Sequence, residues 1–86
     1  MTENDRKLLR LVILRELRLK GDLGVTEPRL HDAVRMHGHD LSLPVLQAEL
    51  RDVENLNWIS SFTPELGAKR WCISPLGEMK YVQSGA

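Results

Sequence analysis

The hydrophobic pattern of this chain changes once, and that change restricts the fold more than any other feature. Up to residue 56, apolar residues recur at three- and four-residue intervals, as in helices that bury one face. Beyond residue 57 come two short runs of strand-forming residues, separated by a loop with proline near its start and glycine near its end. Because 86 residues allow only one small domain, we expect a single, mainly helical α+β unit that ends in a small sheet.

Three core helices are predicted, in addition to a short last one, and each begins after a residue that can cap it. They span residues 4–20, 27–37 and 43–56. Thr2 or Asn4 can cap the first helix, while Thr26 and Ser42 precede the other two, which carry proline in the first turn. Gly38 ends the second helix, so only a tight turn separates it from the third.

The remaining elements are short. Residues 58–74 are expected to form a β-hairpin with a five-residue connection at 64–68. Residues 23–25 form a short extended piece between the first two helices, and Ser74 can cap a last helix at 75–82. Two helices joined by a tight turn form a helix-turn-helix, and the hairpin that follows directly makes this order a winged helix-turn-helix.

A buried stripe is expected along the third helix, and the aromatic side chains of the hairpin are expected to cover the core. The third helix would turn five aliphatic residues inward, namely Leu43, Leu46, Leu50, Val53 and Leu56. Trp58, Phe62 and Trp71 would lie between the sheet and the helices.

Two segments carry a pattern of capping and apolar residues that can be compared with known proteins. Residues 42–59 combine a serine cap, spaced aliphatic residues and an apolar Trp58–Ile59 pair, and residues 73–77 have the sequence Ile-Ser-Pro-Leu-Gly. The first segment is similar to the recognition helix and strand entry, and the second to the end of the wing, of winged-helix DNA-binding proteins, specifically small bacterial or phage regulators of the MarR and PadR type. Asn57 stands where those regulators usually have glycine. The resemblance implies a DNA-binding regulator of transcription.

In this fold the exposed face of helix 43–56 would enter the major groove. Gln47, Arg51 and Asn55 lie on or beside that face and can form paired hydrogen bonds with base edges. Two adjacent cations just beyond the wing loop would contact phosphates. The complete predicted DNA-binding set is Ser42, Pro44, Gln47, Arg51, Asn55, Lys69, Arg70 and Arg29.

The charge distribution leaves a second function open. The chain has 12 basic and 12 acidic residues. Residues 21–57, which contain the whole predicted helix-turn-helix, carry more acidic than basic residues. Glu49, Asp52 and Glu54 share the third helix, and carboxylates repel phosphates. The alternative is therefore a winged-helix protein–protein interaction module that has lost DNA binding, because a fold alone does not fix a function.

Catalysis, a metal site and a cofactor are not expected. His31, His37 and His39 do not have a recognisable zinc-ligand spacing, and we expect His31 on the exposed side of its helix. The one cysteine, Cys72, is expected to be a small buried strand residue. No catalytic motif, signal peptide or membrane-spanning run is found, so the sequence predicts a cytoplasmic protein that is not an enzyme.

The first helix carries apolar residues on more than one face. Leu8 and Val12 point one way, whereas Ile13 and Leu17 point nearly the opposite way. We therefore expect a homodimer that pairs this helix and the last helix across a two-fold axis, with a compact monomer as the alternative.

Overall fold

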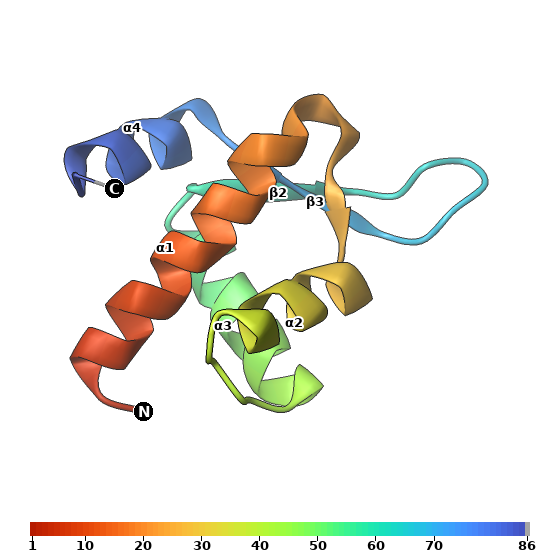
Figure 1. Ribbon diagram of the computed structural model, residues 1–86. Coiled ribbons are helices and arrows are strands. Elements are labelled where there is room, and N and C mark those ends of the chain that lie inside the picture. Colours follow the sequence, from red (N-terminus) through yellow and green to blue (C-terminus); the bar gives the residue numbers. More distant parts are fainter. Residues whose placement is uncertain (86) are drawn as a thin grey trace.

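The computed structural model describes residues 1–85 and consists of four α-helices, one 3-10 turn and a three-stranded sheet (Figure 1). In chain order the elements are α1 (Glu3–Lys20), η1 (Gly21–Leu23), β1 (Val25–Thr26), α2 (Glu27–Met36), α3 (Leu43–Asn55), β2 (Ile59–Phe62), β3 (Arg70–Ile73) and α4 (Pro75–Gln83). This is the mainly helical α+β class that the sequence predicts. Its order of elements is compatible with a winged helix-turn-helix.

The hairpin connection is longer than expected. β2 ends at Phe62 and β3 begins at Arg70, so residues 63–69 form a seven-residue loop, called the wing loop below, rather than the predicted five. Pro64 has no backbone N–H and cannot extend the ladder, which explains why pairing stops before it. Figure 1 shows the wing loop projecting away from the helices, on the side opposite α4.

The sheet has the order β1-β3-β2 and is antiparallel throughout. The central strand β3 pairs Trp71 with both Val25 and Ser61, one on each side. Directly opposed residues point to the same face of a sheet, so Trp71 and Val25 share the face that is covered by helices. β1 therefore connects the helical half of the chain to the wing.

The predicted helix starts differ in how they are capped. The Thr2 hydroxyl accepts from the backbone N–H of Asp5, and the Asp5 carboxylate accepts from that of Thr2, which completes a capping box. Ser74 also caps its helix with its side chain. Thr26 and Ser42 occupy the N-cap positions of α2 and α3, but their side chains make no capping hydrogen bond.

The core forms where α1, α2 and α3 meet the inner face of the sheet. Its fully buried members are Leu9, Ile13, Leu14, Leu17, Leu30, Val34, Leu46, Leu50, Val53, Ile59 and Trp71. Two expectations were wrong: Leu56 is 42% exposed and Phe62 is 41% exposed. Leu56 lies just past the last residue of α3. Phe62 is paired with Arg70, and these two side chains lie on the sheet face opposite Trp71.

The last helix packs against the first. Tyr81 of α4 is buried, and its ring lies 5.4 Å from the guanidinium of Arg18 on α1. Within residues 1–85, no helix is both long enough and apolar enough to cross a bilayer.

Candidate nucleic-acid interface

The exposed side of α3 is the one that the sequence predicts. Because Leu46, Leu50 and Val53 are buried, the opposite side of the helix faces solvent. This polar face of α3 consists of Pro44, Ala48, Arg51 and Asn55, all exposed, with Ser42 exposed at its N-terminal end.

The carboxylates of α3 are not distributed as the sequence suggested. Glu49 is only 5% exposed and points inward, where Arg10 of α1 approaches its carboxylate to 2.6 Å and Arg6 to 3.6 Å. Glu54 is half-buried and accepts a hydrogen bond from Ser61 at 3.4 Å. Of the three acids on this helix, only Asp52 is exposed. The acidic composition of α3 therefore overstates the repulsion that a phosphate backbone would meet.

The inward position of Glu49 has a sequence signal. Residue 49 lies between positions 46 and 53 of the apolar stripe, at three- and four-residue spacing, so it belongs to the buried side of the helix. Arg6 and Arg10 are one helical turn apart on α1, which allows both to reach one carboxylate.

Gln47 is held by a residue that the sequence did not single out. Its side-chain Nε2 donates to Oε2 of Glu27 at 2.9 Å. The other oxygen of Glu27 accepts from the indole N–H of Trp71 at 3.2 Å. Glu27 is the first residue of α2, so one carboxylate links α2, α3 and β3. The only feature of the sequence that points to this role of Glu27 is that a buried tryptophan needs an acceptor for its indole N–H.

The two wing cations do not act as a pair. The Nζ atom of Lys69 lies 4.5 Å from the ring centroid of Trp71, on the helix side of the sheet. Arg70 points to the other side and donates to the backbone carbonyl of Leu23 at 3.3 Å. Neighbouring strand residues alternate between faces, so adjacency in sequence separates these two side chains in space.

A shallow hollow brings three of the predicted residues together. Gln47, Arg51 and Lys69 line it with Glu27 and Trp71, and it has a volume of about 250 Å³. We call it the wing hollow. Its position between α3 and β3 lets a single ligand touch both elements. Of the other predicted residues, Ser42, Pro44, Asn55, Arg29 and Arg70 do not line it.

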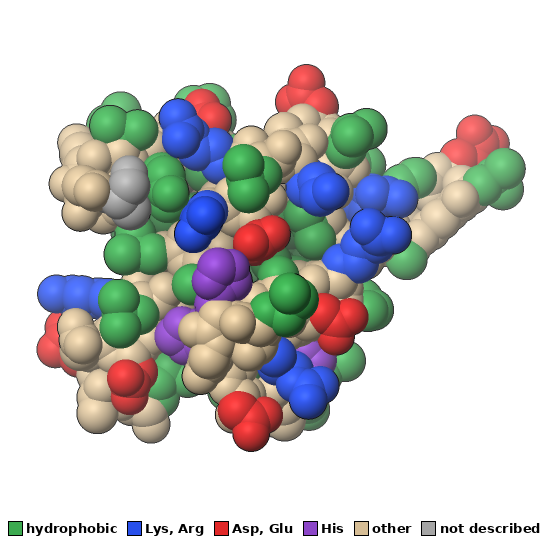
Figure 2. Space-filling model, in the orientation of Figure 1, with side chains coloured by type: hydrophobic (Ala, Val, Ile, Leu, Met, Phe, Trp, Pro, Cys, Tyr) green, Lys and Arg blue, Asp and Glu red, His purple; other side chains and the backbone are tan. Residues whose placement is uncertain are grey.

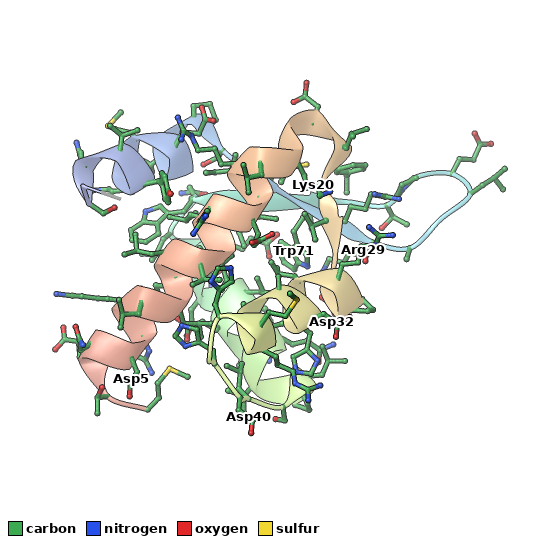
Figure 3. The ribbon with its side chains drawn as sticks, in the orientation of Figure 1. Asp5, Lys20, Arg29, Asp32, Asp40 and Trp71 are labelled. Carbon is green, nitrogen blue, oxygen red and sulfur yellow. The ribbon has the colours of Figure 1, made fainter. Side chains whose placement is uncertain are left out.

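A second group of cations lies where the wing loop leaves the sheet. Figure 2 shows Lys and Arg side chains gathered there beside α2, and Figure 3 places Lys20 and Arg29 in this region. Arg70 joins them through its contact with Leu23 at the end of η1. Lys20 was missed from the sequence because it ends α1, far along the chain from the wing.

Two of the three histidines, His31 and His37, have partners within the fold. His31 is half-buried rather than exposed, and its Nε2 lies 2.6 Å from the carbonyl oxygen of Leu41, which ties α2 to the turn before α3. His37 lies 3.6 Å from the carboxylate of Glu16 on α1. Within residues 1–85, no three His, Cys, Asp or Glu side chains are grouped as metal ligands would be.

Cys72 is half-buried rather than buried, because it lies on the sheet face that η1 covers only in part. Burial raises the pKa of the Cys72 thiol, and the nearby Asp22 carboxylate raises it further. A raised pKa disfavours the thiolate, so this environment does not activate the cysteine.

No family model matches this chain, and neither does any curated protein or solved structure. The resemblance to MarR and PadR regulators therefore stays a prediction from the sequence.

Proposed function

We propose that this protein binds duplex DNA as a transcriptional regulator in the cytoplasm, with α3 in the major groove and the wing loop along the phosphate backbone. The observation that carries the proposal is the wing hollow, where Arg51 of α3 and Lys69 of the wing loop line one surface. The face of α3 beside it exposes a single carboxylate, that of Asp52.

Local charge, rather than net charge, has to supply the affinity. The chain is neutral overall, so it has no general attraction for nucleic acid. Lys69 and Arg29 are exposed near the wing and suit phosphate contacts, whereas Arg51 lies on the face of α3 that would meet the bases. Arg70 keeps free N–H groups beyond its bond to Leu23 and suits the flanking backbone.

A salt-dependent binding titration on mixed-sequence duplex DNA tests the proposal. Each phosphate contact contributes roughly 0.9 to the slope of log affinity against log salt. Lys69→Ala and Arg70→Ala should each flatten the slope by about one unit, and the double variant by about two. Arg35→Ala removes an exposed cation elsewhere and should leave the slope unchanged.

Two results would count against the proposal. An unchanged slope in the Lys69→Ala, Arg70→Ala variant would remove the wing from the interface. Absence of binding to any duplex at low salt would refute DNA binding altogether.

Arg51→Ala should reduce the discrimination between bases by roughly 1–3 kcal/mol at one position of the site only. An equal loss of affinity on all sequences would instead make Arg51 a phosphate contact.

We further propose that the protein acts as a homodimer through α1 and α4. Leu8 is 47% exposed, and it lines, together with Leu11, two hollows of about 570 and 440 Å³ on the surface of α1. An apolar ridge beside two hollows can insert into a second copy of itself across a two-fold axis. Met79 and Val82 of α4 are also exposed and would add apolar area to the interface, although neither lines these two hollows.

Sedimentation equilibrium tests the dimer. Lys7, Arg15 and Lys80 line the same two hollows, so like charges meet across the axis and added salt should strengthen association. Leu8→Lys should abolish association with little effect on folding, because that side chain is half exposed in the monomer. A monomer mass up to about 100 μM at both low and high salt would refute this proposal.

The alternative is a protein-binding module, and one observation favours it. Met36 is 87% exposed on α2 and lines a hollow of about 530 Å³ together with Asp32, Arg35 and Asp40. An exposed methionine beside two carboxylates and one guanidinium suits a partner that presents an apolar side chain surrounded by charges of both signs. The titration above separates the two functions, because a protein-binding module would not bind duplex DNA at low salt.

A further inference from the structure

The side-chain amide of Gln47 is oriented before any ligand arrives. Its Nε2 donates to Glu27 at 2.9 Å, and Glu27 is itself fixed by the indole N–H of Trp71 at 3.2 Å. Trp71 is almost fully buried, so the anchor of this chain of hydrogen bonds cannot rotate. Gln47 therefore differs from Arg51 and Asn55, whose side chains are exposed and make no hydrogen bond within residues 1–85.

The orientation is locked because the two ends of the amide are not equivalent toward a carboxylate. An ionised carboxylate only accepts hydrogen bonds, so the Nε2 end of Gln47 faces it favourably. A flip of the amide would place Oε1 against the negative oxygens of Glu27 and lose the hydrogen bond. Gln47 thus presents a fixed acceptor, Oε1, and one remaining Nε2 hydrogen.

That pattern matches one purine and not the other. Adenine presents an N7 acceptor and an N6 donor in the major groove, which pair with the free Nε2 hydrogen and with Oε1. Guanine presents two acceptors, N7 and O6, so its O6 would meet the fixed Oε1 of Gln47. An unrestrained glutamine could turn its NH₂ group toward guanine, but Glu27 blocks that rotation.

We propose, on the basis of the DNA-binding function above, that Glu27 is a positioning residue that makes Gln47 select adenine over guanine at one base pair. Glu27 itself touches no base in this scheme. Its effect on specificity passes entirely through the orientation of the Gln47 amide.

The first experiment measures base preference on duplexes randomised at each position. The wild type should prefer adenine to guanine at one position by about tenfold or more, the discrimination typical of a paired contact. Glu27→Gln keeps the size of the side chain, but the indole N–H of Trp71 needs its oxygen, so its NH₂ group faces Gln47 and favours the flipped amide. This variant should lose the preference for adenine, or reverse it toward guanine, while other positions keep theirs. Gln47→Met should remove the same preference.

The second experiment is made on the free protein and does not depend on DNA. In the wild type, one side-chain amide proton of Gln47 should exchange slowly with solvent in NMR spectra. In Glu27→Gln that protection should fall while the core amides of Leu50 and Val53 stay protected, which separates loss of the lock from loss of the fold.

The outcomes distinguish failure of this inference from failure of the proposed function. If Glu27→Gln binds DNA with an unchanged adenine preference while Gln47→Met loses it, Glu27 does not position Gln47 and the inference is wrong. If the wild type binds no duplex, DNA binding and base selection both fall. A protected Gln47 amide would then mark a contact that only joins α2 to α3.

Discussion

Replacement of Gly77 by alanine tests the packing of α4 on the rest of the chain. The sign of the change in the free energy of unfolding distinguishes a close contact from an exposed helix. In an exposed helix, glycine to alanine stabilises by about 1 kcal/mol. Here a Cβ at position 77 would overlap the carbonyl oxygen of Trp58 and come within 2.9 Å of Cγ1 of Ile73. The oxygen belongs to the backbone and cannot rotate away, so α4 has to move as a body.

That movement breaks contacts whose contributions to the free energy of unfolding can be approximated. The Ser74 backbone N–H donates to the carbonyl of Trp58 at 2.9 Å, a hydrogen bond of about 1 kcal/mol. The Ser74 hydroxyl accepts from the N–H of Gly77 at 3.0 Å, and loss of such a cap costs about 1 kcal/mol. Partial exposure of Tyr81 adds about 1–2 kcal/mol. After the gain in helix propensity, we expect a net destabilisation of about 2–3 kcal/mol.

Urea unfolding followed by tryptophan fluorescence measures this change. The expected loss corresponds to a fall in Tm of at least about 8 °C for a domain of this size. Gly67→Ala in the wing loop is the matched control, because a Cβ there would make only ordinary contacts, at 3.6 Å and beyond with Pro64, and we expect a change within about 0.5 kcal/mol. A Gly77→Ala variant as stable as the wild type, or more so, would refute the close approach of α4 to Trp58.

Three further predictions concern single side chains. Arg10→Ala leaves the buried Glu49 carboxylate without its nearest partner and should destabilise by about 2–4 kcal/mol in urea unfolding, part of which Glu49→Gln in the same chain should recover; additive losses would contradict the pairing. Because burial raises the pKa of Cys72, iodoacetamide should alkylate the native protein at pH 8 more slowly than the urea-unfolded chain, and equal rates would contradict this environment. Hydrogen bonds from Thr2 lower the pKa of Asp5, so the Asp5 carboxylate should stabilise the folded state at pH values above its unfolded pKa of about 3.9. This stabilisation should be lost as the pH falls through the lower pKa of the folded state. Asp5→Asn should therefore make the stability less dependent on pH in the acid range, and a pH profile identical to that of the wild type would exclude the capping box as the source of this dependence.

The sequence was informative wherever a local rule decides the structure. Ser74 caps α4 as predicted, and of the two candidates for the first helix, Thr2 and Asn4, Thr2 is the cap. Asn57 follows α3 with a φ of 63°, a left-handed conformation that asparagine tolerates better than most residues. The polar face of α3 followed from the spacing of its leucines. Errors occurred at the ends of elements, where Leu56 and Phe62 fit an apolar pattern but stay exposed. They also occurred within elements, where His31 and Cys72 are both half-buried rather than exposed and buried, respectively.

The candidate site was predictable as a set of residue types but not as an arrangement. Arg51, Gln47 and Lys69 were identified because their side chains can bind DNA. The sequence did not reveal that Glu27 restrains Gln47, since the two are twenty residues apart and meet only when α2 packs on α3. It also placed Lys69 and Arg70 together, although Lys69 lies over the ring of Trp71 and Arg70 turns to the opposite face of the sheet, toward Leu23.

The sequence by itself determined the type, order and approximate limits of the elements, because caps, glycine turns and apolar periods act within a few residues of the chain. The tertiary structure alone decided which charges are paired. In the sequence, Glu49 is one of three acidic residues of α3, but in the folded protein Arg6 and Arg10 of α1 pair with its carboxylate and neutralise the charge. The electrostatic character of a surface depends on pairings between elements distant in sequence, and no local pattern encodes those pairings.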